Sequence, residues 1–132
     1  MNVFAKLYLI AFIVFFVIDL LWLGLVAKKL YQKEMGMLLK ANVNWVAAMI
    51  FYLLFILGLV VFVIKPSVDA FSLTKAMLLG AFFGLVTYAT YDLTNLATLE
   101  GFSLKITLID LTWGTSLGFL TSTLTYLIYQ LF

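Results

Sequence analysis

Long runs of apolar residues alternate with short polar segments along the chain. Four such runs occupy residues 3–27, 45–64, 73–99 and 106–132. Each reaches the roughly 20 residues that a helix needs to cross about 30 Å of hydrocarbon. The pattern therefore predicts an all-α integral membrane protein, in which four transmembrane helices form one antiparallel bundle that makes up a single domain, residues 1–132.

Polar signals mark the ends of these predicted helices. The second run ends at Lys65 and Pro66, and a proline there predicts a sharp stop. Residues 100–103 predict a tight turn that joins the last two helices as antiparallel neighbours. The first run is longer than the ~7–15 apolar residues of a signal peptide and precedes no small-residue cleavage site, so we expect it to be retained as a helix.

Lysines are distributed unevenly over the predicted loops. The longest connection, 28–44, contains four of the eight lysines, and a short interfacial helix and an ordinary basic loop are equally good interpretations of it. Together with residues 100–105 it carries five lysines, against three elsewhere. Positive charge collects on cytoplasmic loops, so this bias predicts that both termini face outward and that 28–44 faces the cytoplasm.

Composition narrows the chemistry that the chain can perform. Apolar residues make up 66% of it and charged residues 11%, against about 25% charged in soluble domains. Cysteine, histidine and arginine are absent, which excludes disulfides, thiolate chemistry and imidazole bases. The net charge of +2 is too sparse for a nucleic-acid surface, and no motif indicates a cofactor.

Three of the six acidic residues lie inside predicted helices: Asp19, Asp92 and Asp110. Each costs about 2.5–3.5 kcal/mol at the centre of a membrane, so we expect all three to face the bundle interior. The first and third helices run the same way and the fourth runs back. Counted from the helix ends, all three carboxyls therefore fall about 7–13 Å inside the same membrane face. They can share one site.

A hydrogen-bond donor follows each aspartate three residues later, which is the spacing of one helix face. These donors are Trp22, Asn95 and Trp113. A purely structural interpretation, in which the acids only lock helices together, is weaker because three acids share one depth without a buried lysine. The three carboxylates and Asn95 also carry enough oxygens for Mg²⁺, Mn²⁺ or Ca²⁺, although we expect no metal.

Small residues recur at every fourth position of the last two helices, leading to Asp92 and Asp110. Such rows let helix backbones approach closely. We expect them to pack the third helix against the fourth, and a homodimer face is the alternative. The residues are Gly80, Gly84, Gly114 and Gly118.

The motifs around the aspartates resemble a family of small bacterial predicted membrane proteins of unknown function. The matching strings are TYDLTNLATL at 90–99, DLTWG at 110–114 and DLLWLG at 19–24. YDLTN followed by DxxWG is moderately specific, and the likeness covers nearly the whole chain. The resemblance implies the helical fold, a multi-pass place in the bacterial inner membrane, and the importance of Asp92, Asn95, Asp110 and Trp113. It implies no substrate.

Several functions remain open at this stage. An acidic site inside the membrane favours the binding or transport of a cation, or of a small molecule coupled to protons. The alternative is an intramembrane enzyme that modifies lipid, or an accessory subunit of one, since two neighbouring aspartates can act as acid and base. Expected partners are membrane lipid and a small cationic or lipid-like ligand.

Overall fold

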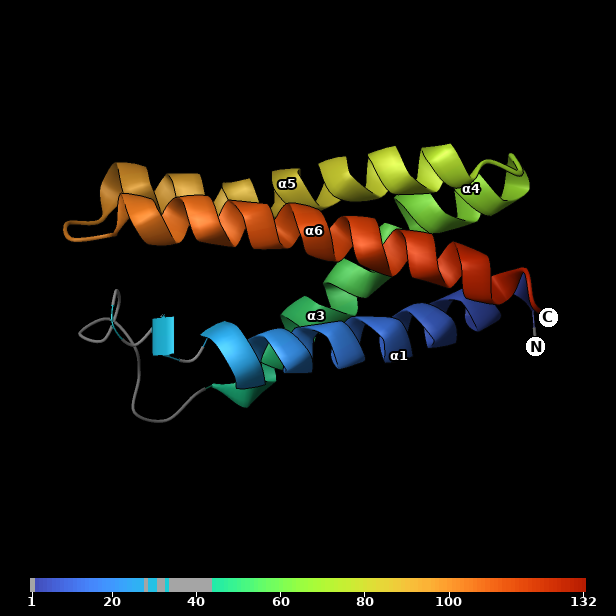
Figure 1. The fold of residues 1–132 in the computed structure, drawn as a ribbon, viewed down its shortest axis with the longest axis horizontal. Helices are drawn as coiled ribbons and strands as arrows, with labels where there is room; N and C mark the ends of the chain where they lie inside the picture. Colours follow the sequence, from blue (N-terminus) through green and yellow to red (C-terminus); the bar gives the residue numbers. More distant parts are fainter. Residues whose placement is uncertain (1, 28, 31–32, 34–43) are drawn as a thin grey trace.

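The structure, a computed structural model, describes residues 2–27, 29–30, 33 and 44–132 (Figure 1). Within these residues every regular element is a helix. The question of an interfacial helix or a basic loop at 28–44 falls almost entirely outside the described residues. The elements are α1 (Val3–Trp22) with the π-helical turn η1 (Leu23–Ala27), then α3 (Trp45–Leu59), the π-helical turn η2 (Val60–Ile64) and α4 (Lys65–Asp69), then α5 (Leu73–Thr98), and α6 (Leu104–Tyr129).

Each of the four long helices begins at a polar side chain that caps it. The side chain of Asn2 accepts a hydrogen bond from the third residue of its helix at 2.8 Å, and Asn44, Ser72 and Ser103 do the same at 3.0–3.2 Å. A cap of this kind satisfies one of the backbone N–H groups left free in a first helical turn. These caps explain why the starts of the helices lie close to the predicted starts.

The second helix does not end where the sequence predicted. It was expected to stop at Ile64, before Lys65 and Pro66, but it continues through the proline to Asp69. The π-helical turn η2 precedes the proline, and the Lys65 N–H bonds to Val60 O, five residues back. A π-helical turn shifts the hydrogen-bonding register by one residue. It therefore lets the helix pass a residue that lacks an N–H of its own.

The long helices form a bundle in which α6 packs against α5 along its length and also against α1 (Figure 1). The helix made by α3, η2 and α4 contacts α1, α5 and α6. A short turn joins α5 to α6, and Gly101 in it has φ +77°, a left-handed conformation that glycine adopts without a Cβ clash. The predicted antiparallel four-helix bundle is thus confirmed.

The backbones of α5 and α6 approach closely along the row of small residues. A Cβ atom at Gly80 would lie 2.6 Å from the Gly118 carbonyl oxygen, and one at Gly84 would overlap the carbonyl of Gly114. Any larger side chain would push the two helices apart. The four glycines expected to pack helices together therefore lie between α5 and α6, within one chain.

Three of the helices are long and apolar enough to cross a membrane, namely Val3–Leu25, Trp45–Asp69 and Leu73–Thr98. The fourth, α6, has the same 26 residues as α5 but contains many hydroxyl groups. It has more buried residues than any other helix, including Thr107, Thr121 and Thr125. These three hydroxyl groups thus face other helices, while apolar side chains such as Leu78 and Phe62 are about two-thirds exposed on the outside.

An apolar core joins α1, the α3–η2 helix and α6. Phe15 is fully buried there, with its ring 5.5 Å from the rings of Tyr52 and Phe55. Phe55 in turn lies 5.4 Å from Phe83 of α5. These aromatic contacts link three helices and lie next to the candidate site, because Tyr52 also belongs to that site.

Candidate functional site

Asp19, Asp92 and Asp110 lie at the end of the bundle that contains the α5–α6 turn. Asp19 continues the buried stripe of α1 that runs through Leu7, Ala11 and Phe15 at four-residue spacing, and it is 5% exposed. Asp92 continues the small-residue row of α5 and is 1% exposed. Residues four apart share a helix face, so the packing of each helix turns its acid inward.

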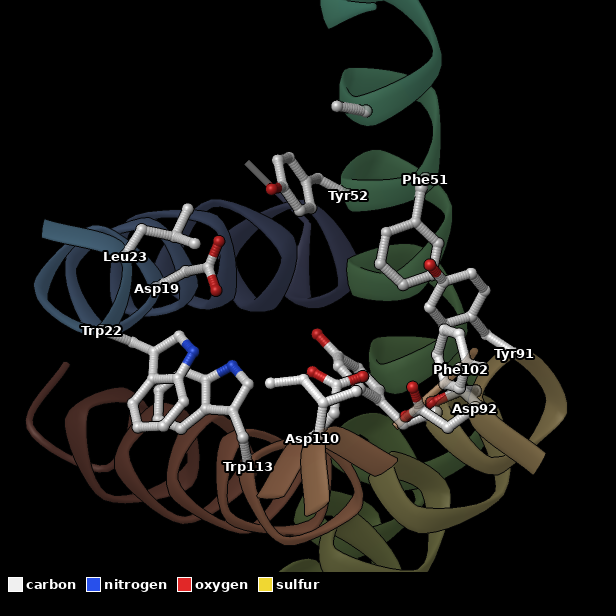
Figure 2. Close-up of a pocket in the computed structure, with 14 residues that line it drawn as sticks. Asp19, Trp22, Leu23, Phe51, Tyr52, Tyr91, Asp92, Phe102, Asp110 and Trp113 are labelled. Carbon is white, nitrogen blue, oxygen red and sulfur yellow. The ribbon is translucent and has the colours of Figure 1, made fainter. Parts of the chain in front are cut away.

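All three carboxyls line one cavity of about 610 Å³ (Figure 2). All four long helices and the turn after α5 contribute to its walls. The walls are mainly apolar and aromatic, and they include Phe51, Tyr91 and Phe102. A volume of this size is in the range of ligand-binding pockets, which are typically about 300–1,000 Å³.

Asp19 is held by donors from two other helices. The indole N–H of Trp113 on α6 and the hydroxyl of Tyr52 on α3 both donate hydrogen bonds to its carboxylate. The sequence predicted that Asp19 would share a helix face with Trp22, the donor three residues later. Instead the donors come from neighbouring helices, so this carboxylate joins α1, α3 and α6.

Asp110 lies between the other two acids (Figure 2) and interacts electrostatically with both. The carboxyls of Asp92 and Asp110 are in hydrogen-bonding contact. Among the described residues, no N–H or hydroxyl group donates to the buried Oδ2 of Asp92. Two carboxylates both accept hydrogen bonds, so they bond to each other only when a proton lies between them.

Trp22 and Trp113 form a stacked pair at one side of the cavity. Their rings lie 4.4 Å apart and are inclined by only 7°. Both ring nitrogens face Asp19 and Asp110 (Figure 2). The Trp113 N–H is bonded to Asp19, whereas the Trp22 Nε1 is buried and has no acceptor among the described residues. The pair therefore presents one indole donor that no described group uses.

Asn95 does not join the other predicted site residues. It is absent from the cavity lining, and its side chain hydrogen-bonds to Tyr91. The structure also does not form the metal site that the sequence left open. Among the described residues, no three acidic side chains are grouped closely enough to hold a metal ion together.

Two tyrosines belong to the site although sequence reasoning did not select them. Tyr52 donates to Asp19, and Tyr91 lines the cavity and interacts with Asp92 and Asp110. One signal could have found Tyr52, because it is the only hydroxyl-bearing residue in the otherwise apolar Trp45–Leu59 helix. Tyr91 is adjacent to Asp92, and adjacent residues of a helix normally point in different directions.

Comparison with known proteins shows which family the chain belongs to. The model of the family described as "Predicted membrane protein (DUF2177)" matches residues 4–127. The match spans all four helices, so the resemblance seen in the sequence is confirmed. No match to the chain was found among the curated proteins or the solved structures.

Proposed function

We propose that this integral membrane protein, which belongs to the predicted membrane protein family DUF2177, binds a small organic cation in exchange for a proton. The binding site is the cavity between the four helices, and the protein acts as a multi-pass transporter in the bacterial inner membrane. The observation that carries the proposal is the Asp92–Asp110 pair, two carboxyls in contact inside a cavity. Within the described part of the chain, no hydroxyl or N–H donates to the buried oxygen of Asp92.

The charge of the cavity favours a cation. Of the residues that the structure describes, three acidic side chains and no lysine line it. Ionisable residues inside membranes are costly and mark ion pathways, proton relays or ligand counter-ions. A pair of carboxyls that shares a proton can release that proton when a positively charged ligand takes its place. Binding of the cation and loss of the proton are then coupled at one position.

The walls of the cavity favour an organic cation over a metal ion. Aromatic rings from every part of the site surround the acids, including Tyr88, Tyr91 and the stacked indoles. Aromatic faces attract ammonium groups, with about 0.5–2 kcal/mol for each well-placed ring. A divalent metal, in contrast, requires several oxygens at one point, and the described residues do not group three acids in that way.

Binding of a defined ammonium ion tests the proposal directly. Calorimetric titration of the detergent-solubilised protein with butylammonium chloride, in two buffers of different ionisation enthalpy, measures affinity and proton release together. We expect binding with the release of up to one proton. Asp92→Asn should weaken binding by about 10- to 100-fold, the loss expected for a charge-assisted contact, and should abolish the proton release.

Asp69→Asn is the matched control, since Asp69 is an exposed acid on α4 that pairs with Lys65 at 2.6 Å, outside the cavity. It should bind butylammonium like the wild type. Absence of binding to the wild type, or equal binding by Asp92→Asn, would overturn the proposal. Proton-coupled uptake of the same ion into proteoliposomes then tests transport separately from binding.

The same aspartate pair favours a second candidate, acid–base catalysis on a lipid. Two carboxyls that share a proton can supply one acid and one base to a reaction. Incubation of the protein with lipid extract, followed by mass spectrometry, tests this function. A product that depends on both Asp92 and Asp110, and that forms without added ammonium, would favour the enzyme over the transporter.

A further inference from the structure

A second hollow lies beside the acidic cavity, on the side of α6 that faces α1. Its volume is about 330 Å³. We call it the outer groove, and its lining residues are Trp22, Leu108, Ile109, Thr112, Trp113 and Ser116. None of these described lining residues carries a charge. Leu108 and Thr112 are exposed, so the outer groove opens onto the apolar outer surface of the bundle.

The two hollows share the stacked indoles as a common boundary. Trp22 and Trp113 are the two residues that line both the acidic cavity and the outer groove. One edge of the pair carries the ring nitrogens toward Asp19 and Asp110 (Figure 2). Tryptophan suits this position because its ring packs against hydrocarbon while its N–H bonds to a polar group.

The two hollows match the two ends of an amphiphilic molecule, a charged head and an apolar chain. The inner one combines carboxyls with aromatic rings, which suits an ammonium group. The outer one is apolar apart from the hydroxyls of Thr112 and Ser116, and Thr112 already donates to the Leu108 carbonyl of its own helix at 2.8 Å. An aliphatic chain suits such an apolar groove, and the groove adjoins the acidic cavity at the two indoles, Trp22 and Trp113.

We propose that the ligand of this site is a single-chain amine, with its ammonium group among the aspartates and its alkyl chain in the outer groove. This inference rests on the proposed function and adds the ligand class. The buried Trp22 N–H, which lacks an acceptor among the described residues, lies at the boundary between head and chain. An oxygen next to the amine would satisfy it, so a long-chain 2-amino alcohol binds more tightly than the plain amine.

The chain-length dependence of binding tests the inference. Burial of each methylene group raises affinity about fourfold. The probes are butylammonium, which reaches only the acidic cavity, and dodecylammonium, which also fills the outer groove. Both are titrated against the full-length protein in the same detergent, and each variant is compared with the wild type so that partition of dodecylammonium into micelles cancels.

The key variant is Ser116→Phe, which adds a ring at a residue that lines the outer groove and not the acidic cavity. We expect it to weaken dodecylammonium binding tenfold or more and to leave butylammonium within twofold of the wild type. Leu120→Phe is the matched control, because Leu120 lies on the same helix and lines neither hollow. It should change neither affinity. Thr112→Phe is the second groove variant, should Ser116→Phe fail to fold by circular dichroism.

The outcomes separate this inference from the proposed function. If butylammonium binds but Ser116→Phe and Thr112→Phe both leave dodecylammonium affinity unchanged, the groove holds only bilayer lipid and the single-chain ligand is refuted. The same conclusion follows if the groove variants weaken both amines equally. If neither amine binds to the wild type, the proposed function falls and the inference falls with it.

Discussion

The close approach of α5 and α6 depends on the missing side chain of Gly84. A Cβ atom at this position would overlap the carbonyl oxygen of Gly114 and would lie 3.3 Å from the backbone nitrogen of Gly118. These are backbone atoms of a long helix, which cannot rotate aside as a side chain could. Gly84→Ala therefore forces the helices apart. Overpacking costs about 1–3 kcal/mol, and a backbone obstacle places this variant near 3 kcal/mol.

Alanine also has a higher helix propensity than glycine, by about 1 kcal/mol. The net loss of stability expected for Gly84→Ala is therefore about 2 kcal/mol. Gly24→Ala supplies the matched control, because nothing lies within 4 Å of a Cβ built at Gly24. That variant should gain up to about 1 kcal/mol. The difference between the two variants isolates the packing cost, about 3 kcal/mol.

The assay is a titration of the protein in maltoside micelles with sodium dodecyl sulfate, followed by far-UV ellipticity and tryptophan emission. Gly84→Ala should unfold at a lower fraction of dodecyl sulfate than the wild type, and Gly24→Ala at an equal or higher one. Free energies of unfolding that agree within about 0.5 kcal/mol, the usual range for substitutions without a structural role, would refute the reasoning. The contact between α5 and α6 would then not require glycine at position 84.

Two further comparisons examine the donors around the site. Tyr52→Phe removes a hydroxyl that donates to Asp19 and should lower the free energy of unfolding by about 1.5 kcal/mol. Tyr8→Phe removes a hydroxyl that donates to a backbone carbonyl at 3.3 Å, and it should lower the free energy of unfolding by only about 0.6 kcal/mol. Trp113→Phe should destabilise more than Trp22→Phe, because only the former removes an N–H bonded to Asp19. The same denaturant titration measures both, and equal losses within either pair would contradict the assigned bonds.

Local sequence was sufficient for much of the architecture. The apolar runs predicted four helices because each must satisfy its own backbone groups inside a membrane. Positions along the helices placed Asp19, Asp92 and Asp110 at one end, since depth depends only on the rise per residue and on the direction of each helix. The glycine rows indicated a face of close contact, because their four-residue spacing is a property of a single helix.

The tertiary structure decided which residues meet, because one helix's periodicity does not fix its neighbours or their relative rotation. Asp19 bonds to Trp113 and Tyr52 from other helices rather than to the donor in its own next turn. Asn95, at the predicted spacing from Asp92, instead bonds to Tyr91. The path of the second helix beyond its proline also depends on a π-helical turn that apolar composition does not reveal. Partners across helices arise from packing, and packing is set by all four helices together.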